Sequence, residues 1–81
     1  MNDELKKLVD FGADIEFTCF GTDYTILPWT DDGISIGIQN DESQDACFET
    51  YEDMIDNYLI DGKKMRDVLD DIRITFTSGA L

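Results

Sequence analysis

The sequence predicts an α+β domain, in which helices pack on one face of a mostly antiparallel, four-stranded sheet. Apolar and polar residues alternate over 14–20 and 34–38, which is the period of a strand with one buried face. Between Met65 and Ile72 apolar residues return every three or four positions, which is the period of a helix. A chain of 81 residues has room for a single domain, residues 1–81, built in the order α-β-β-β-α-α-β.

The first half of the chain predicts one helix followed by three strands. Asn2 or Asp3 can cap a helix that ends near Gly12. We expect Pro28 to end the second strand, because proline cannot donate to a strand ladder. Asp32-Gly33 is the hairpin signal that leads into the third strand. The three expected strands are 14–20, 24–27 and 34–38.

The segment after the third strand predicts a loop and then a helix. Residues 40–46 are polar and are expected to form the loop. Thr50 and Asp53 resemble a capping box, in which a side chain at each position satisfies a free backbone N–H group. Asp61-Gly62 should end the helix. Its predicted core positions are Tyr51, Met54, Ile55, Tyr58 and Leu59.

The last third of the chain predicts another helix and a closing strand. The helix follows from apolar residues at i, i+3, i+4 and i+7, which are Met65, Val68, Leu69 and Ile72. The strand is expected over 73–77, with Ile74 and Phe76 on the same face because they lie two residues apart.

The charge of the chain is its most unusual property. There are 19 acidic residues, six basic residues and no histidine, so the net charge is −13. Between Leu8 and Gly62 there are 14 acids and no base. Phosphates require lysine and arginine, so direct binding to nucleic acid or to an anionic membrane is not expected. No basic, apolar signal segment begins the chain, and no apolar run approaches a membrane span, so a cytoplasmic location is predicted.

Nothing in the sequence predicts catalysis or a cofactor. Imidazole chemistry is excluded because histidine is absent, and neither a nucleophile elbow nor a phosphate-binding loop is present. Cys19 and Cys47 match no zinc or redox spacing, and both are expected to be small buried thiols. An interaction protein is therefore favoured over an enzyme.

A partner-binding surface is predicted around the second helix. Four carboxylates should share one face of this helix, namely those of Glu49, Glu52, Asp53 and Asp56. The predicted surface also includes Asp45 as a neighbouring acid and Trp29 as an aromatic anchor. As a helix, the segment from Glu49 to Asp56 spans ~10 Å, so its charge density is comparable with the one charge per ~1.7 Å of duplex DNA. One hypothesis is thus a DNA-mimic inhibitor of a basic nucleic-acid-binding protein. The other is a soluble domain without a dedicated site, whose charge only keeps it in solution.

A calcium-binding module is the alternative from a different class. The segment 41–52 has acidic or hydroxyl side chains at the EF-hand spacing, namely Asp41, Ser43, Asp45, Glu49 and Glu52. Two features oppose this interpretation. Ala46 occupies the position where the loop requires glycine, and the segment before the loop reads as a strand instead of a helix.

A pattern of residues at turns, helix breaks and strands extends along most of the chain and is similar to that of known small proteins. They are Phe17, Gly21, Tyr24, Ile26, Phe48, Tyr51, Met54, Ile60, Asp61, Gly62, Lys63, Met65 and Ile72. In this pattern the chain resembles uncharacterised small acidic proteins of Gram-positive bacteria and their phages. Phages and mobile elements also encode small acidic anti-CRISPR and anti-restriction proteins that imitate DNA, and the chain is similar to these in size and charge. The resemblance implies a structural pattern but no site residues.

Overall fold

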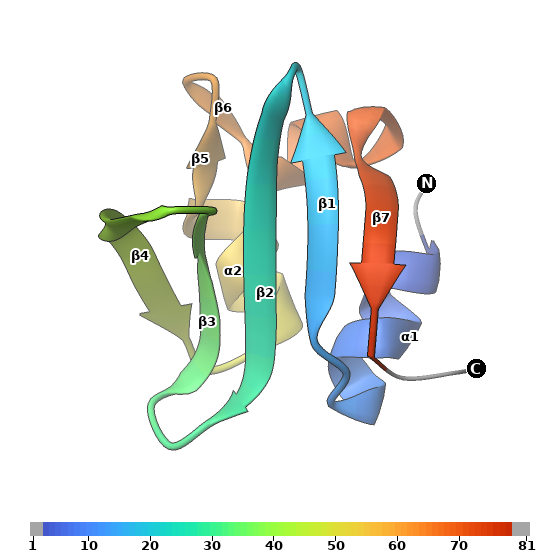
Figure 1. Cartoon of the computed structure of the whole chain (residues 1–81), viewed down its shortest axis with the longest axis vertical. Helices are drawn as coiled ribbons and strands as arrows, with labels where there is room; N and C mark the ends of the chain where they lie inside the picture. Colours follow the sequence, from blue (N-terminus) through green and yellow to red (C-terminus); the bar gives the residue numbers. More distant parts are fainter. Residues whose placement is uncertain (1–2, 79–81) are drawn as a thin grey trace.

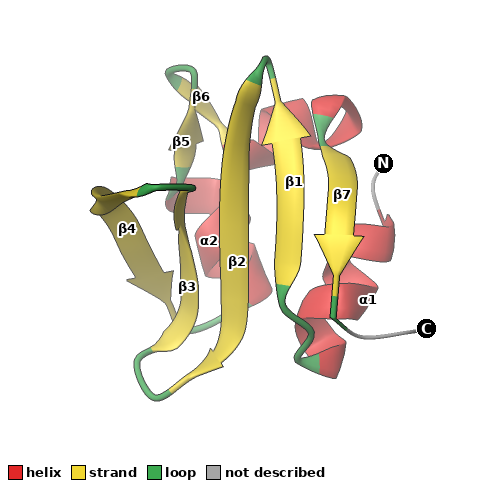
Figure 2. Cartoon of the chain, viewed as in Figure 1, coloured by secondary structure: helices red, strands yellow, loops and turns green. Residues whose placement is uncertain are grey.

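A five-stranded antiparallel sheet forms one layer of the protein, and helical segments form the other (Figure 1). The computed structural model describes residues 3–78. The sheet order is β4-β3-β2-β1-β7, and its strands are β1 Ile15–Cys19, β2 Thr22–Thr30, β3 Gly33–Ile38, β4 Asp41–Phe48 and β7 Arg73–Thr77. The helical segments are α1 Asp3–Phe11, α2 Tyr51–Asn57 and the 3₁₀ helix η1 Met65–Asp71 (Figure 2). A short hairpin, β5 Leu59–Ile60 with β6 Lys63–Lys64, precedes η1.

The α+β class is confirmed, but the sheet has one strand more than predicted. Residues 41–46 of the expected loop belong to β4, which pairs with β3 so that Ile36 lies opposite Ala46 and Ile34 opposite Phe48. Ala46 and Phe48 are partly buried against the core and hold this edge strand in place. The prediction was wrong because the polar residues that begin β4 hide the apolar alternation, which appears only at its end.

Proline does not end β2 as predicted. The strand continues to Thr30, and the pairing of β2 with β3 shifts by one residue between Leu27 and Thr30. Pro28 and Trp29 occupy this bulge, where a residue without a backbone N–H group is tolerated. The bulge also leaves Trp29 61% exposed at the end of the strand.

A second bulge overturns the prediction for β7. Phe17 of β1 lies opposite Ile74, and Glu16 lies opposite Phe76, so the register shifts between these pairs. Thr75 is the extra residue, and its hydroxyl donates to the Glu16 carbonyl at 3.2 Å. Ile74 therefore packs against the core, whereas Phe76 lies on the opposite face and is 52% exposed.

Two tight turns have the backbone conformation that two-residue hairpins require. Positive φ angles occur at Phe20 (51°) with Gly21 (80°), and at Asp61 (54°) with Gly62 (77°). The second pair does not end the helix as predicted, because it forms the turn that joins β5 to β6. Because α2 already ends at Asn57, Leu59 lies in β5 and is 59% exposed instead of buried.

Apart from Leu59, the positions predicted to be buried by the helices are buried. The Thr50 hydroxyl accepts a hydrogen bond from the Asp53 backbone N–H at 3.0 Å, which confirms one half of the predicted capping box. All four predicted positions of the last helix are buried, although the backbone is 3₁₀ and is interrupted at Val68. α1 ends before Gly12 (φ 89°) as expected, whereas the predicted cap Asn2 lies outside the described residues. Among residues 3–78, no helix has the length and apolar character needed to cross a membrane.

The core lies between the sheet and the helices and contains a cluster of aromatic rings. Phe17 is fully buried and stacks on Tyr24 with ring centroids 5.0 Å apart. Tyr58 meets Tyr24 edge to face at 6.3 Å. Together with the aliphatic side chains of α1, α2 and η1, these rings form one continuous buried cluster.

The buried phenol of Tyr58 predicts a loss of stability at high pH. Burial raises the pKa of Tyr58 to about 12, against about 10 for an exposed tyrosine. The neutral phenol is therefore favoured in the folded state, so this contribution is complete below pH 10 and is lost as the pH rises from 10 to 12. We expect the free energy of unfolding, measured with urea, to fall by about 2 kcal/mol over this interval. Tyr58→Phe should show a smaller fall, and an equal fall in both proteins would contradict the assignment to Tyr58.

Candidate protein-binding surface

One face of the sheet has no helix packed on it among the described residues, and we call it the open face. All three helical segments lie behind the sheet in Figure 1, so the open face is turned toward the viewer. Strand pairing sets its central row, in which Glu16 lies between Phe76 and Thr25, and Thr25 lies opposite Gly37. Side chains on these positions alternate with the core residues, because successive side chains of a strand point to opposite faces.

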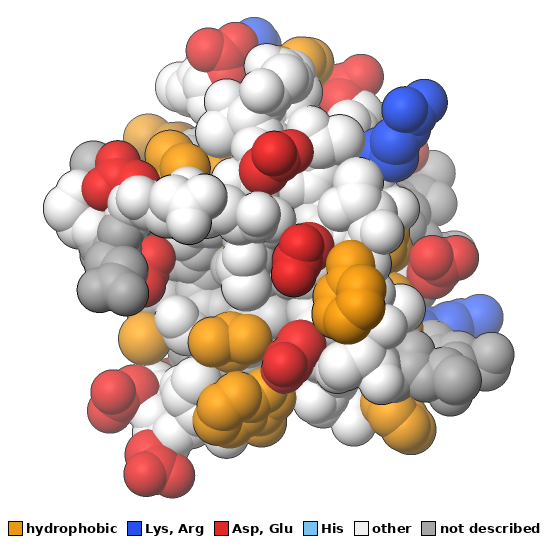
Figure 3. Space-filling view, in the orientation of Figure 1, with side chains coloured by type: hydrophobic (Ala, Val, Ile, Leu, Met, Phe, Trp, Pro, Cys, Tyr) orange, Lys and Arg blue, Asp and Glu red, His pale blue; other side chains and the backbone are white. Residues whose placement is uncertain are grey.

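The open face is rich in carboxylates and poor in bases. By strand alternation it carries Glu16, Asp23 and Asp45, and Arg73 lies opposite Thr18 at one edge. The basic side chains visible in Figure 3 lie at the margins of this face, whereas acidic ones lie across it. The two ion pairs found among residues with described side chains, Lys6–Asp10 and Arg66–Asp56, involve none of these three carboxylates.

Exposed aromatic side chains accompany these acids. Phe76 is brought to the open face by the β7 bulge. The Trp29 indole N–H donates to the carboxylate of Asp14, which lies two residues before Glu16 and hence on the same side of the sheet. Figure 3 shows apolar and acidic side chains interspersed over this surface. Aromatic groups among polar ones are typical of protein interfaces.

The structure does not bring the six predicted site residues together. Asp45 lies on the open face, and Trp29 is held at its margin. The other four belong to or precede α2, in the layer behind the sheet, and all are exposed: Glu49, Glu52, Asp53 and Asp56. The predicted site is therefore divided between two sides of the molecule.

The surface of α2 is less negative than its sequence predicts. Arg66 of η1 donates to Asp56 at 2.5 Å, and this hydrogen bond lowers the pKa of the Asp56 carboxyl. Lys6 of α1 pairs with Asp10 at 2.7 Å and places its ammonium 5.8 Å from the ring of Tyr51, the first residue of α2. Two of the six bases thus lie beside this helix, which weakens its likeness to a row of phosphates.

The calcium alternative requires a loop that this segment does not form. Asp41, Ser43 and Asp45 lie in β4, an extended strand, whereas an EF-hand loop wraps around its ion. The Ser43 hydroxyl instead donates to the Asp41 carboxylate at 2.5 Å. Within the described part of the chain, no group of three or more acidic or cysteine side chains has a geometry suited to a metal ion.

The cysteines differ in burial, contrary to the expectation that both are buried. Cys19 is in the core, and burial raises the pKa of its thiol. Cys47 is exposed because it lies opposite Ser35, on the open face.

The sequence reasoning missed Glu16, Asp23 and Phe76 as surface candidates. The alternation of β1 indicates that Glu16 points away from the core, but which side chains of other strands lie beside it depends on strand pairing, which no local pattern gives.

Comparison with known proteins adds no assignment to this geometry. The resemblance to small acidic proteins of Gram-positive bacteria and phages stays a prediction. No protein-family model matches the chain, and no match was found among curated proteins or solved structures.

Proposed function

We propose that this chain is a non-enzymatic protein-interaction domain that binds a basic protein through the open face of its sheet. The observation that carries the proposal is the composition of that face. Exposed Phe76 lies opposite Glu16, Trp29 lies at the margin, and the three carboxylates of the face form no ion pair with the bases of described side chains. Exposed aromatic residues anchor partners by burying large areas, and charge complementarity selects and steers the partner.

The charge of the whole chain supports a basic partner. With a net charge of −13, the domain repels nucleic acid and anionic membranes at long range and attracts a positive surface. A DNA-mimic inhibitor is the narrower form of this function, in which the positive surface is the groove of a nucleic-acid-binding protein. In that form, duplex DNA competes with the domain for the partner.

The dependence of binding on salt tests the electrostatic part of the proposal. We expect a protein retained from a lysate of the source organism by the immobilised chain to be released as salt rises from about 0.1 to 1 M, because the screening length falls from ~10 to ~3 Å. Mass spectrometry identifies the eluted protein, and an unrelated acidic protein on the same resin controls for simple ion exchange. Retention that does not change with salt, or that the control reproduces, would refute the proposal.

A further inference from the structure

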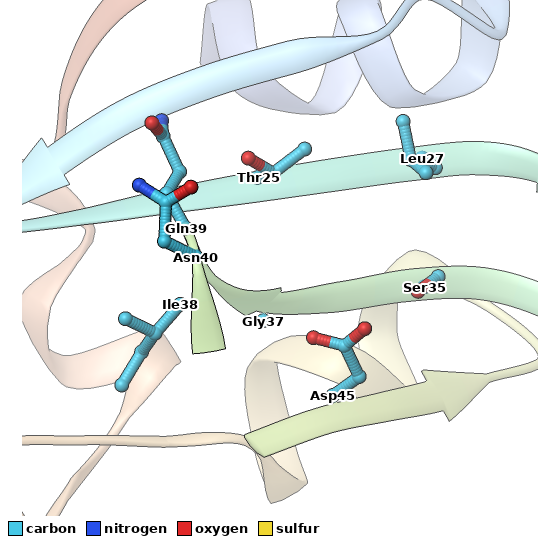
Figure 4. A pocket seen from close by; sticks show the side chains of 8 residues that line it. All are labelled: Thr25, Leu27, Ser35, Gly37, Ile38, Gln39, Asn40 and Asp45. Atoms are coloured by element: carbon cyan, nitrogen blue, oxygen red, sulfur yellow. The ribbon is translucent and has the colours of Figure 1, made fainter. Parts of the chain in front are cut away.

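A shallow pocket of about 150 Å³ lies on the half of the open face that ends at the edge strand β4. Figure 4 shows its walls: Thr25 and Leu27 come from β2, Ser35 from β3 and Asp45 from β4. Gly37 of β3 forms its floor. The pocket thus spans three neighbouring strands and lies within the surface proposed to bind the partner.

The glycine at position 37 makes room for the acid that borders the pocket. A Cβ atom added to Gly37 would collide with the Asp45 carboxylate, standing 2.8 Å from its Cγ and 3.2 Å from the Asp45 Cα. Glycine within a strand is destabilising, and its presence marks a close approach of another group. Here it allows the carboxylate to lie over β3 at the edge of the pocket (Figure 4).

The pocket offers hydrogen-bond acceptors beside an apolar wall. Asp45 contributes two carboxylate oxygens, and Thr25 and Ser35 contribute hydroxyls. Gln39, at the end of β3, donates from its side-chain nitrogen to the Tyr24 carbonyl at 3.2 Å and to Glu16 at 3.4 Å, which links the pocket to a second carboxylate. Leu27 provides the apolar surface. A ligand that matches this lining carries several N–H donors, a positive charge and an apolar stem.

We propose that this pocket receives the guanidinium group of an arginine side chain on the partner, with Asp45 as its acceptor and Leu27 against its methylene stem. The assignment rests on the proposed function, of which it is a more specific form. Arginine fits this pocket better than lysine, because its planar guanidinium group presents paired donors that match a carboxylate, whereas an ammonium group offers only a point charge.

A titration of the isotope-labelled protein with short peptides tests this assignment. The probe is acetyl-Ala-Arg-Ala-amide, and the control replaces arginine by citrulline, which has the same shape but no charge. We expect the arginine peptide to shift the backbone amide signals of Thr25, Ser35, Gly37 and Asp45, and the citrulline peptide to leave them in place. Equal shifts from citrulline, equal affinity for a lysine peptide, or shifts confined to α2 would each overturn the assignment.

Two variants locate the binding at Asp45. Asp45→Asn keeps the shape of an exposed side chain and should lower the affinity for the arginine peptide by at least ~10-fold. This is the loss expected when one charge-assisted pair becomes neutral. Asp53→Asn removes the same charge from α2 and should leave the affinity unchanged. An equal loss of affinity in both variants would show a general charge effect and would overturn the assignment of the pocket as the binding site.

The pocket and the proposed function can fail separately. If neutralising the whole open face abolishes retention of the partner but no arginine peptide binds, the interaction domain stands and the pocket is refuted. If the peptide binds in an Asp45-dependent manner but no basic protein is retained, the guanidinium site stands and the proposed function is refuted.

Discussion

Phe17→Ala is expected to lower the free energy of unfolding by about 3–5 kcal/mol, because truncating a buried phenylalanine removes apolar contacts and leaves a cavity. Phe17 is fully buried in β1, between β2 and β7, and it stacks on Tyr24. A domain of this length has a total stability of roughly 4–12 kcal/mol. The variant should therefore be close to unfolding at 25 °C, as measured by urea denaturation with circular dichroism.

Phe11→Ala is the matched control for this prediction. Phe11 is the last residue of α1 and is 60% exposed, so its truncation should change stability by less than ~0.5 kcal/mol. If Phe17→Ala and Phe11→Ala had similar unfolding midpoints, the aromatic cluster would not be the centre of the core.

The second large effect is expected on binding. Glu16→Gln, Asp23→Asn and Asp45→Asn together remove three negative charges from the open face and keep the size of each side chain. We expect the affinity for the basic protein retained from the lysate to fall by at least ~100-fold, because truncating charges paired across an interface costs about 2–5 kcal/mol. Calorimetry with the purified pair measures this loss. An unchanged urea midpoint shows that the variant is folded, and an affinity within a few-fold of the unsubstituted chain would contradict the prediction.

Local sequence signals predicted the parts of the fold that depend on neighbouring residues. The spacing of Met65, Val68, Leu69 and Ile72 identified four buried positions, whereas Asp61-Gly62, expected to end a helix, forms the turn between β5 and β6. The alternation in β1 and β3 placed Ile15, Phe17, Ile34 and Ile36 on the buried face. These patterns reflect periodicity along the chain, which does not require knowledge of the partner strand.

The bulges and the edge strand could not be predicted in this way because they depend on pairing. Thr75 becomes the extra residue only when β7 is aligned with β1, and this alignment decides that Phe76 faces outward. β4 begins with polar residues because it is an edge strand with one open face, so its signal resembles that of a loop. Residues 41–48 form a strand because they pair with β3, and a local sequence pattern does not reveal this pairing.

The same reason explains how much of the candidate site could be predicted. The sequence indicated a negative surface and named Asp45 and Trp29, but it assigned the main charges to the helix after Thr50. It could not foresee that Arg66, ten residues after Asp56, would neutralise that acid. Nor could it show that Gly37 leaves space for the Asp45 carboxylate, since these residues meet only through the pairing of β3 with β4.

The most direct test of the open face is to compare two variants with the same change in net charge. One carries Glu16→Gln, Asp23→Asn and Asp45→Asn, and the other carries Glu49→Gln, Glu52→Gln and Asp53→Asn before and on α2. We predict that the first loses at least ~100-fold in affinity for the basic partner. The second should remain within ~3-fold of the unsubstituted chain, because exposed charges outside an interface contribute little. Equal losses in both variants would contradict a defined binding face and would leave the carboxylates with no role beyond keeping the domain in solution.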